Sequence, residues 1–533
     1  MKPFDENGRF RPTQDLSALR RLALRGAGVT VFSSGLSLAV QIVATVVLAR
    51  LLVPADFGLV AMVTTFSLLL ANFGVNGFTE VVIQWNEIQE NLVSNLFWIN
   101  LSVGLALTIA FAAAGSLLAR FYHDPLVTPV TVGVSLTILI TSASVQHLAL
   151  LKRAMRFSVV SANDVLSRIV LVILTIVLAR AGWRYWALVA GLIAQPLSMA
   201  IGAWWLCRWT PRLPRRVAGT GSMVRFALNV YGRFTVNYFA RNTDNLLVGW
   251  RFDSQALGFY KKAYDLFALP AGLLVSSLTD VAVSAMSRLN RDRVQYRRYF
   301  LSAFAVLAFV GMGLGADLTL VGKDVIRLML GARWNPAGRI FTFFAPGIGI
   351  MFLYGTHGWI HLSIGRPDRW LRWGVIEFSA TFLMFILGLR WGPGGVAVAW
   401  AASFWILTLP ALWYAGRPIQ LGIGPMIRVV WRYVLASGVA GCASALIVRG
   451  IPSLMAAQGM VGAVSRIEDV SILFGILYLT AVIALHRGLV PLYQVSRLVQ
   501  EIVPLGRFSR RRAAAAPSEA TSARDGKAIT LSA

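Results

Sequence analysis

Polar side chains recur along one side of an otherwise apolar stretch, residues 223–249. At 100° per residue they fall within about 120° of arc on a helix. They are Asn229, Arg233, Asn237, Arg241 and Asp244. Burying an ionised side chain in a membrane is costly, so such residues rarely face lipid. We therefore expect this face to line a water-filled or protein-filled interior.

The charges of this stripe do not cancel. Asp244 lies three residues after Arg241, which is a spacing that permits an intrahelical ion pair. One carboxylate cannot neutralise both Arg233 and Arg241, so net positive charge remains. A purely structural role for both arginines would require further carboxylates nearby, and we favour a role in lining a polar lumen.

A second polar stripe, without charge, follows the first apolar stretch, residues 27–49. Its members fall within about 80° of arc on a helix. They are Thr30, Ser34, Ser37, Gln41 and Thr45. Small residues such as Ser34 and Ser37 often serve helix–helix packing, and that alternative stays open for them. If the two stripes occupy equivalent places in two halves of the molecule, they meet across a central cleft, with Gln41 and Ser37 among its lining residues.

The remaining chemistry-bearing residues are few. Arg168 is a third intramembrane arginine and a candidate lining residue, whereas Glu377 lies near enough to a helix end to reach the surface. His357 and His361 have i,i+4 spacing, but they lack the glutamate of an HExxH motif and a third ligand, so we expect no metal. The sequence has no Walker motif, nucleophile elbow or paired-carboxylate site. We predict a non-enzyme that has no cofactor and does not use ATP directly.

Composition identifies the environment of these residues. Of the 533 residues, 57% are hydrophobic and only 14% charged, and the mean hydropathy is +0.66. Soluble domains average about 25% charged residues, so we expect an all-α integral membrane protein. The net charge of +27 lies mostly between apolar runs. We interpret it as a topology signal rather than as a nucleic-acid footprint, and expect no nucleic-acid partner.

Fourteen apolar stretches approach the length of about 20 residues that spans a bilayer. They are 27–49, 59–83, 96–119, 127–150, 165–179, 186–207, 223–249, 266–286, 300–321, 340–364, 374–389, 394–414, 429–448 and 470–485. The Lys/Arg bias of the loops predicts that both termini are cytoplasmic. This organisation gives a basic N-terminal tail (1–26), an N-lobe of helices 1–6 (27–207), a basic linker (208–222), a C-lobe of helices 7–12 (223–415), helices 13 and 14 (416–487), and a basic, partly disordered tail (488–533).

The two predicted lobes carry a weak internal repeat about 200 residues apart. ARLLVPADFGLV (residues 49–60) and GWRFDSQALGFY (residues 249–260) each have an arginine at the end of an apolar run, followed by a glycine with apolar or aromatic neighbours. Gly58 and Gly258 are the matching glycines. Such repeats are common in transporters whose site lies between two halves.

Four segments resemble a known family, the polysaccharide flippases of the Wzx type in the multidrug/oligosaccharidyl-lipid/polysaccharide exporter superfamily. The segments are ARLLVPADFGLVAMV (49–63), FGVNGFTEVVIQ (73–84), NLFWINLSVGL (95–105) and ARNTDNLLVGWRFDSQALGFYKKAYDLFALP (240–270). Asn72 and Glu80 depart from the family's charge pattern, so no role is assigned to Glu80. The resemblance implies two six-helix lobes around a V-shaped cavity, with two extra C-terminal helices.

The resemblance also implies a substrate, an undecaprenyl-pyrophosphate-linked oligosaccharide, flipped across the cell inner membrane by alternating access. Arginine suits the pyrophosphate because its planar fork binds phosphate in a bidentate manner and stays charged. The energy source would be a proton or sodium gradient or downstream consumption of product, with Asp244 as the candidate coupling residue. Membrane lipids, a polysaccharide polymerase and chain-length or export machinery are candidate partners.

Three other functions remain open from the sequence, and one of them is a non-transporting scaffold for glycan assembly. A cation-coupled multidrug exporter of the same superfamily would favour an acidic cavity, whereas the excess charge here is basic. A membrane polymerase or ligase would need a large outer loop for its active site, and the longest predicted outer loops have about 20 residues.

Overall fold

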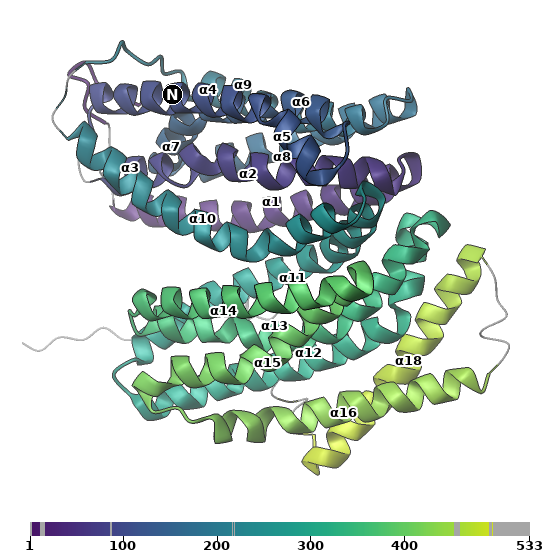
Figure 1. Ribbon diagram of the computed structural model, residues 1–533. Helices are drawn as coiled ribbons and strands as arrows, with labels where there is room; N and C mark the ends of the chain where they lie inside the picture. The colour runs from purple at the N-terminus through teal and green to yellow at the C-terminus, as the bar shows by residue number, and fades with distance from the viewer. Residues whose placement is uncertain are drawn as a thin grey trace, which may run out of the picture.

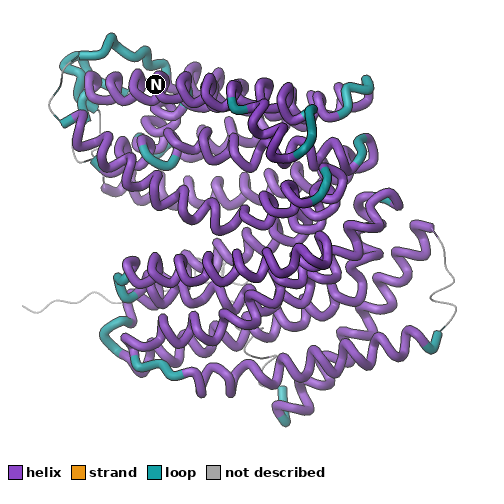
Figure 2. The backbone as a smooth tube through the Cα atoms, in the orientation of Figure 1, coloured by secondary structure: helices purple, strands orange, loops and turns teal. Residues whose placement is uncertain are grey.

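Apolar helices make up nearly all of the molecule. The structure is a computed structural model that describes residues 3–10, 16–85, 88–215, 217, 219–451, 459–489 and 493. Every regular element within these residues is a helix, and none is a strand (Figure 2). The α-helices are α1 (Leu16–Leu51), α2 (Pro54–Val75), α3 (Phe78–Gln84), α4 (Glu90–Ala113), α5 (Gly115–Tyr122), α6 (Val127–Ser142), α7 (Val145–Arg153), α8 (Phe157–Arg180), α9 (Tyr185–Cys207), α10 (Thr220–Arg251), α11 (Ser254–Leu289), α12 (Arg293–Leu330), α13 (Asn335–Ser363), α14 (Pro367–Gly388), α15 (Gly392–Gly416), α16 (Ile423–Arg449) and α18 (Gly459–His486). Short 3-10 turns η1 (Ala332–Trp334), η2 (Leu389–Trp391) and η3 (Arg417–Ile419) connect some of them.

Eleven stretches of the described residues are long and apolar enough to cross a membrane, and one of them covers both α14 and α15. Large apolar side chains on these helices lie on the outer surface, among them Leu446, Ile201 and Ile406. A soluble monomer rarely exposes so much contiguous apolar surface, whereas a bilayer requires it. The predicted all-α membrane fold is confirmed, and the exact count of fourteen spans stays a prediction.

Several predicted spans are broken by a short turn. The span predicted at 59–83 consists of α2 and α3, that at 96–119 contains most of α4 and the start of α5, and that at 127–150 consists of α6 and part of α7. At the first break, Asn76 and Gly77 leave the helix, and the Asn76 side chain bonds Asn72 one turn earlier. Breaks of this kind are tolerated where the backbone is covered by protein.

The start of α11 differs most from the sequence-based prediction. The helix begins at Ser254, whereas the apolar stretch was predicted to begin at residue 266. Asp253 caps it by accepting a hydrogen bond from the Ala256 N–H at 2.7 Å. A capping aspartate satisfies a free N–H of the first turn, and so the charged residues that follow are helical.

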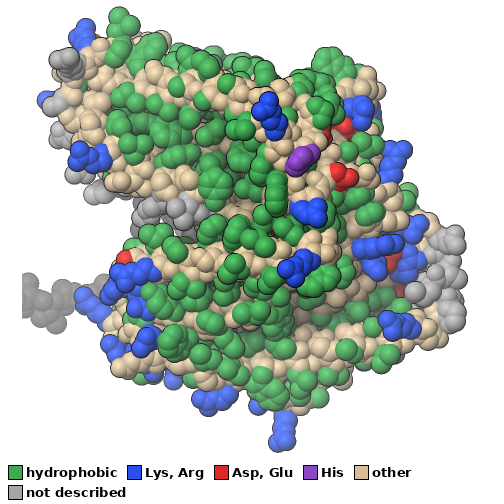
Figure 3. Space-filling view, in the orientation of Figure 1, with side chains coloured by type: hydrophobic (Ala, Val, Ile, Leu, Met, Phe, Trp, Pro, Cys, Tyr) green, Lys and Arg blue, Asp and Glu red, His purple; other side chains and the backbone are tan. Residues whose placement is uncertain are grey.

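The helices form two lobes that diverge from a shared end (Figure 1). Helices α1–α9 build the N-lobe and α11–α15 build the C-lobe, while α16 and α18 pack on α12. Helix α10 packs against both lobes: on α2, α3, α4 and α5 of one, and on α11, α14 and α15 of the other. The space-filling view shows the molecule hollowed between the lobes (Figure 3). We call this side the open end and the shared side the closed end.

Two glycines hold the lobes together at the closed end. A Cβ on Gly58 of α2 would overlap the carbonyl oxygen of Ser254, and one on Gly258 of α11 would overlap that of Pro54. Trp334 of η1 is fully buried beside this crossing, with its ring centroid 5.5 Å from Phe57 and 6.0 Å from Phe259. Its indole N–H donates to the Ala49 carbonyl at 2.8 Å. The closed end is therefore a tightly packed junction.

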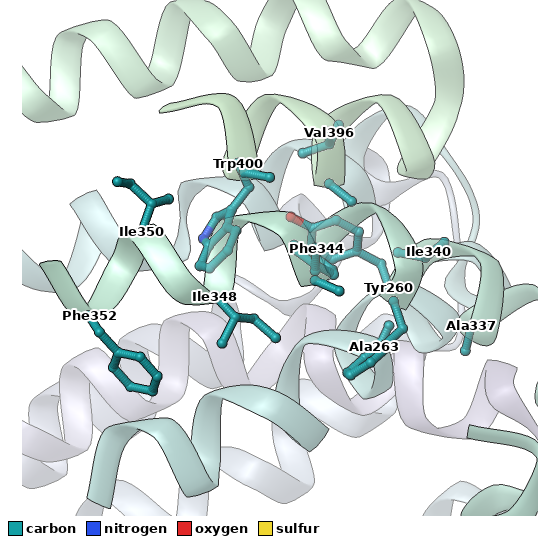
Figure 4. Close-up of a cluster of buried hydrophobic side chains, with 14 of the residues drawn as sticks. Tyr260, Ala263, Ala337, Ile340, Phe344, Ile348, Ile350, Phe352, Val396 and Trp400 are labelled. Atoms are coloured by element: carbon teal, nitrogen blue, oxygen red, sulfur yellow. The ribbon is translucent and has the colours of Figure 1, made fainter. Parts of the chain in front are cut away.

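The C-lobe has a core of closely packed aromatic and aliphatic side chains (Figure 4). Phe344 of α13 lies 5.2 Å from Tyr260 of α11 and 5.3 Å from Trp400 of α15, measured between ring centroids. Helix α18 is fixed to α12 by an ion pair between Arg466 and Asp324 at 2.6 Å. The two C-terminal helices thus extend the C-lobe from its outer side.

The N-terminal segment partly departs from the expected tail at 1–26. Helix α1 begins at Leu16. Residues 3–10 lie on the N-lobe, where Arg9 pairs with Gln89 in an isolated β-bridge and the Phe4 ring lies 6.1 Å from that of Trp209. The described part of this segment is therefore docked on the lobe.

Candidate functional site

Helix α10 carries the predicted arginine stripe, and two tyrosines fix it to the N-lobe. The hydroxyl of Tyr231 donates to the Leu69 carbonyl at 2.9 Å, and that of Tyr238 donates to the Thr65 carbonyl at 2.7 Å. Both acceptors lie on α2, so one face of α10 is committed to that helix.

Of the predicted stripe, Asn229 and Arg241 have exposed side chains, whereas Asp244 is buried. Arg233 and Asn237 lie on the α10 backbone, but their side chains fall outside the described ones.

Asp244 has a different partner from the one its spacing suggests. The hydroxyl of Tyr260 on α11 donates to Asp244 Oδ2 at 2.9 Å, and Lys261 lies within electrostatic range. The ion pairs of the described residues do not include Arg241 with Asp244. The intrahelical pair is therefore corrected to an interhelical contact, because the carboxylate is buried against α11. Asp244 is shielded from the hollow in this conformation, and its role in ion coupling stays a prediction.

Arg241 faces the C-lobe. It lies within electrostatic range of Tyr264 on α11, Tyr354 on α13 and Glu377 on α14. Helix α10 packs directly on both α11 and α14, which carry two of these groups. An exposed guanidinium that makes no ion pair within the described residues leaves binding capacity for an anion. We take the wall bearing Arg241, Tyr264, Tyr354 and Glu377 as the candidate site.

The charged residues of α11 were not among the site candidates predicted from the sequence. Lys261 pairs with Asp265 at 2.6 Å one turn later, and Lys262 lies 4.3 Å from the centroid of the Phe57 ring on α2. The apolar stretch was predicted to begin only at residue 266, so these residues appeared to belong to a loop. The N-cap at Asp253 and the i,i+4 spacing of Lys261 and Asp265 are the signals that could have identified them.

The N-lobe candidates lie on α1 and α8. Ser37 and Gln41 are half-buried on α1, and the Ser37 hydroxyl oxygen is buried with no protein partner among the described residues. Arg168 on α8 pairs with Asp164 at 2.9 Å, one turn earlier on the same helix. That pair already satisfies part of its charge, which favours Arg241 over Arg168 as the free cation. A cavity role for Ser37, Gln41 and Arg168 stays a prediction.

His357 and His361 are both buried on α13, with ring centroids 6.0 Å apart. No group of three potential metal ligands occurs among the described residues. The Nδ1 atom of His357 lies 2.5 Å from the Tyr354 carbonyl oxygen. Both rings are therefore enclosed by protein within the C-lobe.

Comparison with known proteins agrees with this architecture. A model of the family described as "Polysaccharide biosynthesis protein" matches residues 47–339, more than half of the chain. The succinoglycan biosynthesis transport protein ExoT of Rhizobium meliloti is 23% identical over 67% of this chain and 72% of its own length. The teichuronic acid biosynthesis protein TuaB of Bacillus subtilis is 26% identical over 59% of this chain and 67% of its own length.

Among solved structures, the lipid II flippase MurJ in an inward closed conformation is similar to this fold. The TM-score is 0.69 at 15% identity, and the match covers 87% of this chain and 99% of MurJ. At this identity the likeness shows the fold alone. It confirms the predicted two-lobe class, whereas the residues of the site stay predictions.

Proposed function

The chain belongs to the polysaccharide biosynthesis protein family, and on that premise we propose that it flips a lipid-linked oligosaccharide across the cytoplasmic membrane. The observation that carries the proposal is the position of Arg241. This cation is exposed on α10, the helix that packs on both lobes. The lobes meet at one end and diverge at the other (Figures 1 and 3). A pyrophosphate-linked sugar head group fits a positive wall, while its polyprenyl tail stays in the bilayer.

The arginine stripe supplies the proposed head-group contacts. Arg241 and Arg233 would hold the pyrophosphate through charge-assisted hydrogen bonds, with Asn229 and Asn237 beside them on α10. Gln41 and Ser37 on α1 would contact the sugars from the N-lobe. Binding of this kind changes no covalent bond, so we propose a transporter rather than an enzyme.

Alternating access would use the junction at the closed end. Gly58 and Gly258 allow the helix backbones to touch, and so tight a crossing would seal this end of the cavity while the other end is open. Closing the open end and separating the closed end would move the site from one side of the membrane to the other.

We propose that the protein lies in the cell inner membrane, with its open end and both termini on the cytoplasmic side. Arg366 directly precedes α14, and Arg369 and Arg372 lie in the first turns of that helix. The basic linker that precedes α10 packs on α4 of the N-lobe. Cytoplasmic loops carry an excess of Lys and Arg. The same proposal includes lobe boundaries at 27–207 and 223–415, a polymerase partner and an ion-coupled energy source.

The test compares two arginines of one helix. Arg241→Gln removes the cation at the candidate site, and Arg251→Gln removes an exposed cation in the last turn of α10 at the closed end. Polysaccharide exported per molecule of inserted protein should fall at least about tenfold for Arg241→Gln, because a charge-assisted phosphate contact is lost. Lipid-linked repeat units should accumulate inside the cell. The Arg251→Gln variant should export normally, and equal export by both variants would refute the phosphate site.

A further inference from the structure

A cavity of about 900 Å³, which we call the linker cavity, lies between α4 and the linker that joins α9 to α10. Trp98, Ile99 and Val103 of α4 line one side of it, and Pro214 and Val217 of the linker line the other. Ligand sites commonly measure about 300–1,000 Å³ and are mostly apolar, with a few polar groups that orient the ligand. The linker cavity has the size and the apolar walls of such a site.

The linker cavity is separate from the candidate site for the substrate anion. Helix α10 reaches it only with Thr220, the first residue of that helix. Arg241 lies 21 residues later on the same helix, which is about 30 Å away at 1.5 Å per residue. A head group bound in the linker cavity would therefore not contact Arg241.

Hydrogen bonds fix the linker as a wall of this cavity. The Asn95 side chain donates to the Arg215 carbonyl oxygen at 2.6 Å and accepts from the Arg215 N–H at 3.0 Å. One turn away, the Trp98 indole N–H donates to the Arg212 carbonyl oxygen at 2.8 Å, and the Arg212 N–H donates to Ser94 Oγ at 3.1 Å. Four bonds between α4 and two linker residues make the cavity a built feature of the N-lobe.

The charge of the linker cavity is positive. Arg212 forms an ion pair with Glu90 at 2.7 Å, which neutralises that arginine. Arg215 lines the cavity, its side chain is exposed, and it enters no ion pair within the described part of the chain. The first turn of α10 adds to this potential, because no side chain caps it and a helix N-terminus favours anions. A ligand with a negative group fits this rim.

The apolar surface continues from the linker cavity along α4. Ser102 lines the cavity, and Leu105 and Ile109 follow it at three and seven residues, so all three share one face of the helix. The side chains of all three are exposed. They belong to the stretch Glu90–Ala113, which is long and apolar enough to cross a membrane, so this face contacts hydrocarbon. A long apolar chain that starts in the cavity can therefore lie along α4.

We propose that the linker cavity binds one anionic phospholipid. Its phosphate is held by Arg215 beside the first turn of α10, and one acyl chain lies over Ser102 and Leu105 on α4. A free phosphate would leave the apolar walls unused, and a zwitterionic lipid would not use the excess charge. The bound lipid holds the linker on the N-lobe. The inference does not depend on the proposed function, because it involves neither Arg241 nor transport.

The test measures lipid binding to the full chain in detergent by native mass spectrometry. The first molecule of dioleoyl phosphatidylglycerol should bind about fivefold more tightly than the first of dioleoyl phosphatidylcholine, the factor expected from about one arginine at an anionic head group. Arg215→Gln should abolish this preference. Arg208→Gln is the matched control and should retain it, because Arg208 is exposed on the same linker but does not line the cavity.

Two further variants test the apolar wall. Ser102→Trp fills the cavity and should weaken the first binding of both lipids, whereas Ser102→Ala leaves the cavity open and should not. Hydrogen exchange gives a readout that does not depend on counting lipids. Phosphatidylglycerol should slow exchange of the Arg212 and Arg215 amides in the natural chain, because the lipid holds the linker on α4, and should not slow it in Arg215→Gln.

Three results would overturn the inference. An equal loss of preference in Arg208→Gln and Arg215→Gln would mean that general surface charge, rather than the cavity, selects the lipid. An unchanged preference in Arg215→Gln, or normal binding in Ser102→Trp, would place the lipid elsewhere. If undecaprenyl phosphate binds more tightly than phosphatidylglycerol and Arg215→Gln abolishes that difference, the occupant is a polyprenyl lipid and not a phospholipid.

Discussion

Gly58 on α2 and Gly258 on α11 lie against each other's helix, so that a side chain on either would overlap a backbone carbonyl of the other. The two residues occupy equivalent positions in the internal repeat, and the structure brings them together at the closed end. The pairing explains why a glycine recurs there: only the absence of a Cβ lets the two helix backbones approach this closely.

The first prediction concerns this crossing. Gly58→Ala and Gly258→Ala should each lower the free energy of unfolding by about 1–3 kcal/mol, because overpacking displaces backbone rather than a flexible side chain. The measurement is thermal unfolding in detergent, followed by fluorescence. Gly441→Ala on α16 is the control, since an added Cβ there meets no atom within 4 Å. Equal stability of all three variants would show that the crossing can relax.

The second prediction concerns Asp244 and Tyr260. Tyr260→Phe removes the hydroxyl that donates to Asp244 Oδ2 and leaves a buried carboxylate short of a partner, which should cost about 1–3 kcal/mol. Asp244→Asn keeps an acceptor and should cost less. Chemical denaturation in micelles would measure both. Arg241→Gln should leave stability unchanged, since Arg241 is exposed and makes no ion pair with Asp244 among the described residues. A loss in Arg241→Gln equal to that in Tyr260→Phe would contradict this assignment.

The sequence was sufficient to predict the all-α membrane class and the pair of glycines in the repeat, because these depend on local composition and spacing. It could not predict the partner of Asp244. The i,i+3 spacing suggested Arg241, whereas Tyr260 approaches from another helix, and such a contact depends on how α10 and α11 pack. The family resemblance identified residues 240–270 as a characteristic segment, but it did not predict the contact between Asp244 and Tyr260 within that segment.

The charged residues of α11 illustrate a second limit. Lys261, Lys262 and Asp265 looked like a loop, because hydropathy alone placed the start of the helix at residue 266. Each charge is nevertheless stabilised, two as an ion pair and one over the Phe57 ring. A polar helical turn inside a membrane protein is recognised only when its partners are known. The same holds for Glu377, which was expected to reach the surface and is half-buried on α14.

The third prediction concerns the attachment of the C-terminal helices. Arg466 and Asp324 form a partly buried ion pair between α18 and α12 at 2.6 Å. Arg466→Met or Asp324→Asn alone should destabilise the protein by about 1–3 kcal/mol, since a charged hydrogen bond is lost. The double variant should cost less than the sum of the two, because neither charge is then left unpaired. A double-mutant cycle in detergent measures the coupling, and strict additivity would mean that the pair contributes nothing.

The fourth prediction concerns Trp334, which closes the junction beside the glycine crossing. Trp334→Phe should cost about 0.5–1.5 kcal/mol, because it loses the hydrogen bond to the Ala49 carbonyl but keeps an aromatic ring between Phe57 and Phe259. Trp334→Ala should cost about 3–5 kcal/mol, because it also leaves a cavity between Phe57 and Phe259. If the junction separates during transport, the alanine variant should also favour the conformation that is open at this end.

Thiol labelling measures that shift. A cysteine introduced at Ala263, which is fully buried on α11, would report access from the closed end. The exposed Cys442 is first replaced by alanine, so that only the buried Cys207 remains as background. A membrane-impermeant maleimide added from the closed end should label Ala263→Cys faster in the Trp334→Ala background than in the Trp334→Phe background. The two labelling rates could be equal although Trp334→Ala loses stability as expected. Trp334 would then stabilise the fold without controlling access, and the contact that moves would lie elsewhere in the junction.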